Sequence, residues 1–141
     1  MSGSSNLLDP VIAEQLLSAA HNAATHAYAP YSSFRVGAAL LFDDGYIATG
    51  CNVENVSYGL TSCAERNALF RAISERGAAH RIVAIAVANL NEAASPPCGA
   101  CRQVMNEFVT ADATVLFPGE AGTEVRRFAE LLPFTFHLAV K

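Results

Sequence analysis

The chain has 141 residues, the length of one ordinary domain, and 52% of them are apolar while only 16% are charged. This composition excludes a disordered chain, because disorder requires low hydrophobicity and high net charge. Aspartate and glutamate (13) outnumber lysine and arginine (9), giving a net charge of −4. Polynucleotide binding draws its affinity from basic contacts to phosphate, so no polynucleotide partner is expected. The apolar excess predicts contacts between subunits.

No segment is typical of export or membrane insertion. Residues 1–10 lack the basic segment and apolar stretch of a secretory signal. The longest apolar runs, Val36–Phe42 and residues 82–88, are far shorter than the ~20 residues that cross a bilayer. We therefore expect a cytoplasmic protein with no membrane partner. We take residues 1–9 as an N-terminal tail and residues 10–141 as a single domain.

The first predicted elements are a helix and a hairpin. Asp9 followed by Pro10 is a helix-start signal, and apolar residues at helical spacing extend this helix over about residues 10–28. Two strand-like runs follow, Val36–Phe42 and residues 46–53, with an Asp-Gly pair between them. That arrangement predicts a β-hairpin.

The rest of the chain alternates predicted helices and strands. The continuous β-branched run in residues 81–89 is typical of a strand buried on both faces. Caps and periodicity predict helices over about residues 62–76, 99–109 and 125–132, and a short strand over residues 114–117. Elements in this order predict an α/β domain in which helices cover a sheet.

Three of the four cysteines lie where helices are predicted to begin. Cys98 and Cys101 form a C-x-x-C at one helix start, and Cys63 stands at another. Helix N-termini favour thiolates, the form of cysteine that binds metal. A cytosolic chain rarely carries disulfides, so this arrangement predicts one zinc ion on three thiolates, with a fourth position open for water. Arg66 and Arg102 are the candidate cations that balance the excess negative charge.

Glu65 supplies the acid–base group that hydrolysis at such a site needs. In the first turn of a helix its side chain can reach the same centre as Cys63, although residues i and i+2 do not share a helix face. A carboxylate there takes a proton from zinc-bound water and returns it to a leaving group. Cys63-Ala64-Glu65 followed by Pro97-Cys98-Gly99-Ala100-Cys101 satisfies the pattern of zinc deaminases, in which the glutamate is not a ligand.

Longer stretches around these motifs resemble a known family. They are Cys51-Asn52-Val53-Glu54-Asn55, residues 63–66 and residues 97–103, supported by residues 31–40 and 130–133. Over about residues 10–136 the chain resembles the small homotetrameric cytidine deaminases of pyrimidine salvage. The resemblance implies a homotetramer with a three-layer α/β/α fold and a mixed five-stranded sheet. It also implies hydrolysis of cytidine and 2′-deoxycytidine to uridine and 2′-deoxyuridine with release of ammonia.

The resemblance implies a role for each site residue. Cys63, Cys98 and Cys101 would hold one Zn²⁺ per subunit with its bound water or hydroxide, and Glu65 would shuttle protons to the ring nitrogen and the departing ammonia. Asn52 and Glu54 would bind the ribose hydroxyls, and Phe34 would line the pyrimidine pocket. Phe136 would stack on the base from a neighbouring subunit, and the Ala64 N–H and the Pro96 carbonyl would hydrogen-bond the base. Tyr58 would contact substrate or a neighbouring subunit, and Arg66 would hydrogen-bond the thiolates.

The residue types agree with a nucleoside substrate. Asn52 and Glu54 are two residues apart on a predicted strand end, so both side chains point to one face. An amide and a carboxylate suit neutral sugar hydroxyls, whereas the carboxylate repels a 5′-phosphate. Three residues depart from the family's pattern: Val56, Asn67 and Phe134. Val56 and Phe134 are expected near the pocket and the subunit contacts, so substrate preference is the property that these two bring into question.

Several alternatives remain open from sequence. One is a closed structural zinc site, with Cys51 or His80 as a fourth ligand, in a non-catalytic protein. Another is a redox pair of Cys98 and Cys101. A third is a zinc deaminase for a different aminopyrimidine nucleoside. Asn52 and Glu54 are also typical turn-capping residues, and Phe34 and Phe136 are also typical core residues.

Overall fold

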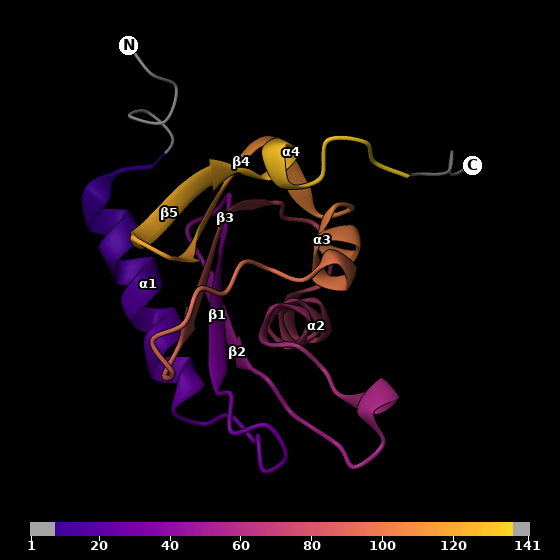
Figure 1. Ribbon diagram of the computed structural model, residues 1–141. Coiled ribbons are helices and arrows are strands. Elements are labelled where there is room, and N and C mark those ends of the chain that lie inside the picture. The colour runs from indigo at the N-terminus through magenta and orange to yellow at the C-terminus, as the bar shows by residue number, and fades with distance from the viewer. Residues whose placement is uncertain (1–7, 137–141) are drawn as a thin grey trace.

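A mixed five-stranded sheet forms the centre of the molecule (Figure 1). The computed structural model describes residues 8–136. The strands lie in the order β2-β1-β3-β4-β5, and only the β3–β4 pair is parallel. Their bounds are β1 (Val36–Phe42), β2 (Ile47–Cys51), β3 (Ile82–Asn89), β4 (Val109–Gly119) and β5 (Gly122–Arg127).

Helices cover both faces of this sheet. On one face lies α1 (Pro10–Ala24), and on the other lie α2 (Ala64–Arg76), α3 (Gly99–Met105) and the short α4 (Phe128–Leu131) (Figure 1). The implied three-layer α/β/α fold with a mixed five-stranded sheet is therefore confirmed. Among residues 8–136, no helix has the length and apolarity that a bilayer crossing requires.

Glycines let two helices approach the sheet closely. A Cβ atom on Gly37 of β1 would lie 1.9 Å from the carbonyl oxygen of Ala20 in α1. On the opposite face, a Cβ atom on Gly50 of β2 would lie 2.4 Å from the backbone nitrogen of Ala68 in α2. Real Cβ atoms do not approach backbone so closely, so only glycine fits at either position. The second contact fixes α2, and hence its N-terminus, against β2.

The first half of the chain follows the sequence prediction closely. The α1 helix begins at Pro10, where the Asp9 carboxylate accepts a hydrogen bond of 2.8 Å from the Val11 N–H. It ends at Ala24 rather than near residue 28, and the Thr25 hydroxyl donates back to the Asn22 carbonyl at 2.6 Å. The predicted hairpin is present as the antiparallel pair of β1 and β2.

The second half requires two corrections. The helix predicted over residues 125–132 is wrong in its first part, because residues 125–127 belong to β5 and only Phe128–Leu131 are helical. A tight turn between Gly119 and Gly122 folds β5 back onto β4, and backbone pairing overrides the apparent helical period. The helix predicted over residues 99–109 ends at Met105, and the strand predicted over residues 114–117 is part of a longer β4 that begins at Val109. Most of the predicted tail over residues 1–9 lies outside the described residues.

Candidate active site

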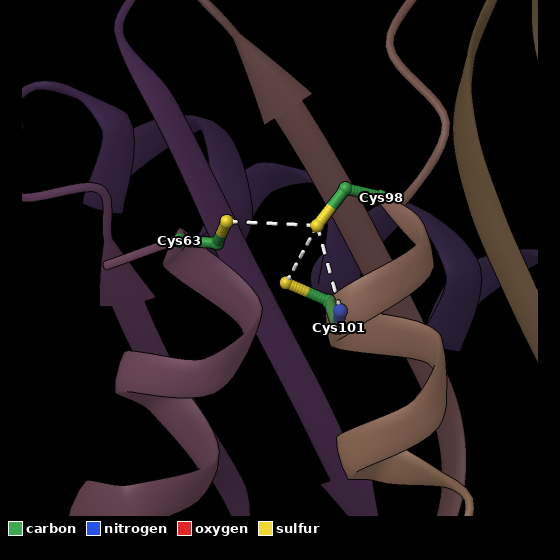
Figure 2. A group of neighbouring side chains, drawn as sticks. All are labelled: Cys63, Cys98 and Cys101. Atoms are coloured by element: carbon green, nitrogen blue, oxygen red, sulfur yellow. Dashed lines mark hydrogen bonds between the residues drawn. The ribbon is translucent and has the colours of Figure 1, made fainter. Parts of the chain in front are cut away.

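Three cysteine thiols meet at the beginnings of α2 and α3 (Figure 2). Cys63 is the N-cap of α2 and Cys98 is the N-cap of α3. The Sγ of Cys98 lies 3.6 Å from the Sγ of Cys63 and 3.3 Å from that of Cys101. The Cys101 N–H also donates to the Cys98 Sγ at 3.4 Å. The two helix starts therefore converge, as the cysteine spacing predicted.

Arg66 is the cation that contacts this cluster. Its Nη2 donates to the Sγ of Cys63 at 3.4 Å. The other candidate, Arg102, uses its guanidinium elsewhere, donating to the carbonyls of Pro97 at 2.7 Å and Leu131 at 3.0 Å. Of the two candidates, Arg66 is therefore the one that contacts a thiol, and its role in balancing the charge stays a prediction.

The pKa values of the Cys63 and Cys101 thiols are shifted in opposite directions. A hydrogen bond from Cys101, reinforced by one from Arg66, lowers the pKa of the Cys63 thiol to about 5. The same bond to Cys63, together with burial, raises the pKa of Cys101. These contacts favour the thiolate form at Cys63, the thiol next to Arg66.

The donor set fits zinc. A tetrahedral zinc with Zn–S bonds of 2.3 Å holds its sulfurs about 3.8 Å apart, close to the spacing observed here. All three sulfurs lie within 4.8 Å of one another. Among residues 8–136, no fourth histidine, cysteine or carboxylate joins this group, and His80 belongs to a separate one with Asp43 and Asp44. A closed site with Cys51 or His80 as fourth ligand is therefore excluded.

Glu65 lies beside the cluster in the first turn of α2. Its side chain is buried, with the residue only 4% exposed. Burial, reinforced by the neighbouring Cys63 thiolate, raises the pKa of Glu65 to about 7. A carboxyl group that titrates near neutrality can both accept and release a proton.

A cavity of about 260 Å³ opens in front of these groups. It brings together Glu65, two of the thiols and four of the predicted substrate-binding residues. Its lining residues are Phe34, Val36, Asn52, Thr61, Cys63, Ala64, Glu65, Val87, Ser95, Pro96 and Cys98. A second hollow of about 270 Å³ shares Thr61 with the first and is lined by Tyr31, Ser32, Glu54, Asn55, Tyr58 and Thr61.

Asn52 and Glu54 also hold the segment that carries Phe34. The Asn52 side chain accepts from the Val36 N–H at 2.9 Å and donates to the Phe34 carbonyl at 2.8 Å. The Glu54 carboxylate accepts from the hydroxyl and the N–H of Ser32 and from the N–H of Tyr31. The hydroxyl bond from Ser32 is the main cause that lowers the pKa of Glu54. Both residues therefore cap turns as the alternative interpretation expects, Asn52 in the lining of the cavity and Glu54 in the lining of the second hollow.

Phe136 is not brought to the cavity. It is 68% exposed, and its carbonyl accepts a bond of 3.4 Å from the Gln103 side chain. Tyr58 lines the second hollow but is 78% exposed. Two of the residues that depart from the family's pattern, Val56 and Phe134, are exposed and line neither hollow.

Comparison with known proteins identifies the family. The family model for the cytidine and deoxycytidylate deaminase zinc-binding region matches residues 11–117. The chain belongs to this family. It is 49% identical to a cytidine deaminase of Halalkalibacterium halodurans over 125 residues, which are 87% of this chain and 92% of the relative. It is 46% identical to a cytidine deaminase of Mycobacterium tuberculosis over 119 residues, 84% of this chain and 85% of the relative.

Solved structures of cytidine deaminases agree with the fold. The crystal structure of the enzyme from Mycobacterium tuberculosis matches with a TM-score of 0.77 and 43% identity, covering 89% of this chain and 97% of that chain. The enzyme from Burkholderia pseudomallei matches with a TM-score of 0.77 and 45% identity, covering 87% of this chain and 98% of that chain. Both matches extend over nearly the whole described structure.

In this deaminase, sequence reasoning missed several residues of the site. Thr61, Val87 and Ser95 line the cavity. Thr61 and Ser95 could have been found from the sequence, because they stand close to Cys63 and Pro96, whereas nothing near Val87 in the sequence points to the site. Asn67 was noted only as a departure from the family's pattern. Its amide donates to the Cys51 carbonyl at 2.8 Å and accepts from the Ser62 hydroxyl at 2.6 Å. It therefore ties the end of β2 to the segment before Cys63.

Proposed function

We propose that this protein hydrolyses cytidine to uridine and ammonia, with 2′-deoxycytidine as a second substrate, as a step of pyrimidine salvage. One observation carries the proposal: the carboxyl group of Glu65, a residue only 4% exposed, and the thiols of Cys63 and Cys98 line one cavity. The family match and the cytidine deaminase names of its relatives support the same reaction.

The reaction divides between the metal and Glu65. We propose that Cys63, Cys98 and Cys101 hold one zinc ion per subunit, with Arg66 balancing the thiolate charge. When bound, zinc supplies a Lewis acid that activates water for attack on C4 of the base. Glu65 would take one proton from the attacking water and deliver it to the ring nitrogen N3, then take the second proton from the hydroxyl group added at C4 and pass it to the amine, which leaves as ammonia. Its raised pKa allows both transfers at neutral pH.

The remaining cavity residues bind the nucleoside. The Ala64 N–H and the Pro96 carbonyl would hydrogen-bond the base O2 and amino group, and Phe34 would contact the pyrimidine ring. Asn52 and Glu54 would hold the ribose hydroxyls. Since hydrogen bonds lower the pKa of Glu54, its carboxylate is charged at neutral pH and disfavours a 5′-phosphate. This charge supports a nucleoside substrate over a nucleotide.

We propose that the protein is a homotetramer. Support comes from three exposed apolar side chains within five residues of the chain, Val56 (75% exposed), Tyr58 and Leu60, of which Tyr58 lines the second hollow. Phe136 is likewise exposed, and a neighbouring subunit would place it on the base. Isolated exposed apolar residues are common, but a contiguous set beside a site is typical of an interface. Sedimentation tests the assembly, and a monomer that keeps full activity at all dilutions contradicts it.

A cytoplasmic location is the last part of the proposal. Cys51, Cys63, Cys98 and Cys101 are all free thiols. A reducing compartment keeps such thiols available as metal ligands, whereas an oxidising one favours disulfides.

The decisive test of the proposed reaction is Glu65→Gln. This variant keeps the side-chain shape but cannot carry the proton, so we expect zinc content to stay normal and kcat for cytidine to fall about 100- to 10,000-fold. Turnover is followed by ultraviolet absorbance and ammonia release. The matched control is Glu75→Gln on the same helix, an exposed residue that pairs with Arg71 at 3.5 Å.

The outcomes separate the alternatives. A zinc-loaded wild-type protein that releases no ammonia from cytidine contradicts the proposed function. Activity on another aminopyrimidine nucleoside, but not on cytidine, supports the alternative deaminase. Loss of zinc from Glu65→Gln contradicts the proton-carrying role, because that role requires Glu65 not to be a ligand.

A further inference from the structure

The segment that carries Phe34 has no regular structure, yet the backbone groups around Phe34 are all paired. The Ser33 N–H donates to the Ala29 carbonyl at 2.9 Å. The Phe34 N–H donates to the Ser32 hydroxyl at 3.0 Å, and the Phe34 carbonyl accepts from Asn52. Because an irregular loop needs external partners to hold one conformation, these contacts decide where the Phe34 ring lies.

Asn91 contacts both peptide groups that flank Phe34. Its Nδ2 donates to the Ser33 carbonyl at 3.0 Å, and its Oδ1 accepts from the Arg35 N–H at 3.1 Å. These groups belong to the peptide bonds immediately before and after Phe34. One side-chain amide, used as donor and acceptor together, thus fixes the backbone on both sides of the aromatic residue.

Backbone strain marks the same contact. Among residues 8–136, positive φ in non-glycine residues is confined to Ser33, at 60°, and Glu92, at 54°. Ser33 offers its carbonyl to Asn91, and Glu92 follows Asn91 directly. Such conformations persist only where the surroundings determine them. The side-chain amide of Asn91 donates a hydrogen bond to the carbonyl of this strained residue, Ser33.

Asn91 is itself held by the end of β3. Its N–H donates to the Asn89 side chain at 2.9 Å, and the neighbouring Leu90 N–H donates to the Arg35 carbonyl at 3.0 Å. The loop that starts here continues to Pro96 and Cys98. Asn91 therefore joins two walls of the cavity, the Phe34 segment and the loop that leads to a zinc ligand.

We propose that Asn91 is a positioning residue that sets the Phe34 ring against the substrate base. The proposal rests on the proposed function, since the ring acts on the base that the enzyme deaminates. Asn91 lines neither hollow, so it acts on substrate through Phe34. The role requires a neutral amide, because an aspartate keeps the acceptor for Arg35 but turns a second acceptor toward the Ser33 carbonyl.

Steady-state kinetics of Asn91→Ala and Asn91→Asp test the role. We expect KM for cytidine to rise about 10-fold while kcat changes less than about 3-fold, because a contact made equally in the ground and transition states appears in KM. Zinc content should match the wild type. Asn22→Ala, which removes an exposed amide from α1, is the matched control and should leave both constants unchanged.

A double-mutant cycle separates positioning from general destabilisation. In a Phe34→Ala background, Asn91→Ala should raise KM no further, because the ring that it positions is absent. An equal rise in KM in both backgrounds overturns the proposal. An Asn91 variant that loses zinc, or that has a lower kcat with an unchanged KM, also overturns the proposal, because neither effect is expected from a displaced Phe34 ring.

Amide hydrogen exchange gives a readout that does not depend on turnover. In Asn91→Ala, exchange at the Arg35 N–H should accelerate about 10-fold or more, while Ile85 in the core of β3 stays protected. Unchanged exchange at Arg35 overturns the positioning role whatever the kinetics. If the wild type fails to deaminate cytidine, the proposed function falls, and accelerated exchange at Arg35 still identifies the Asn91 contact.

Discussion

The two ends of α2 each carry a group of three potential metal-ligating side chains, and the two groups differ in ligand type and exposure. At the N-terminus the group is Cys63, Cys98 and Cys101, and at the C-terminus it is Asp43, Asp44 and His80. Helix dipoles favour negative charge at the first end and positive charge at the second. Soft thiolates select zinc, whereas exposed carboxylates do not.

Both carboxylates of the C-terminal group already have partners within the protein. Asp44 pairs with Arg76, the last residue of α2, and this hydrogen bond lowers the pKa of Asp44. Asp43 lies 2.8 Å from the His80 Nδ1 and accepts from the Arg81 N–H at 3.2 Å, and these bonds lower the pKa of Asp43. Both groups bring their ligand atoms close together, but they differ in chemistry: one is a set of thiols beside a buried carboxyl group, and the other is a set of exposed side chains in which Asp44 already pairs with Arg76.

The largest expected difference between the two ends is in metal content. Cys98→Ala removes the sulfur that contacts both other thiols, so we expect zinc affinity to fall more than about 100-fold and cytidine turnover to be lost. Asp43→Asn should change neither. Metal analysis after dialysis against a chelator measures the first effect, and Cys51→Ala is the matched cysteine control. Equal zinc loss from Cys98→Ala and Asp43→Asn would show that the two groups are equivalent.

The thiol end was predictable because its information is local. Cys63 and Glu65 stand within one turn, Cys98 and Cys101 within another, and helix N-termini direct them toward a common point. His80 shows the limit of that reasoning. As a free-standing histidine it was a candidate fourth ligand, but the return of the chain after α2 carries it to the hairpin of β1 and β2.

The fold, like the site, was predictable where the sequence information is local. Elements with strong local signals, such as the Asp9-Pro10 start of α1 and the continuous apolar β3, match the prediction. The β5 strand was missed because its residues gain strand structure only by pairing with β4. Asn91 was missed for a similar reason, since its partners Ser33 and Arg35 lie more than fifty residues away in sequence.

A smaller difference is expected from the arginines at the two ends of α2. Arg66→Ala removes the donor to Cys63, raises the pKa of that thiol and so makes a metal ion compete more strongly with a proton. We expect zinc affinity to fall about 10-fold. Arg76→Ala is the matched change at the other end and should leave zinc affinity unaltered. Competition with a zinc chelator measures both, and similar affinities for the two variants would contradict the importance of the Arg66 contact.

The smallest expected effect is a pH-dependent stability at the carboxylate end. Because Arg76 lowers the pKa of Asp44 below 3.8, the folded state favours the ionised carboxylate. The contribution is fully present above 3.8 and is lost as pH falls through the lowered folded value. Asp44→Asn should therefore be less stable than wild type at neutral pH, with a difference in free energy of unfolding that shrinks in acid. Urea unfolding across this range measures the difference, with exposed Asp112→Asn as control. A gap that does not change with pH would mean that the Asp44–Arg76 pair adds no ionic stabilisation, and the proposed contrast in ion pairing between the two ends of α2 would then be wrong.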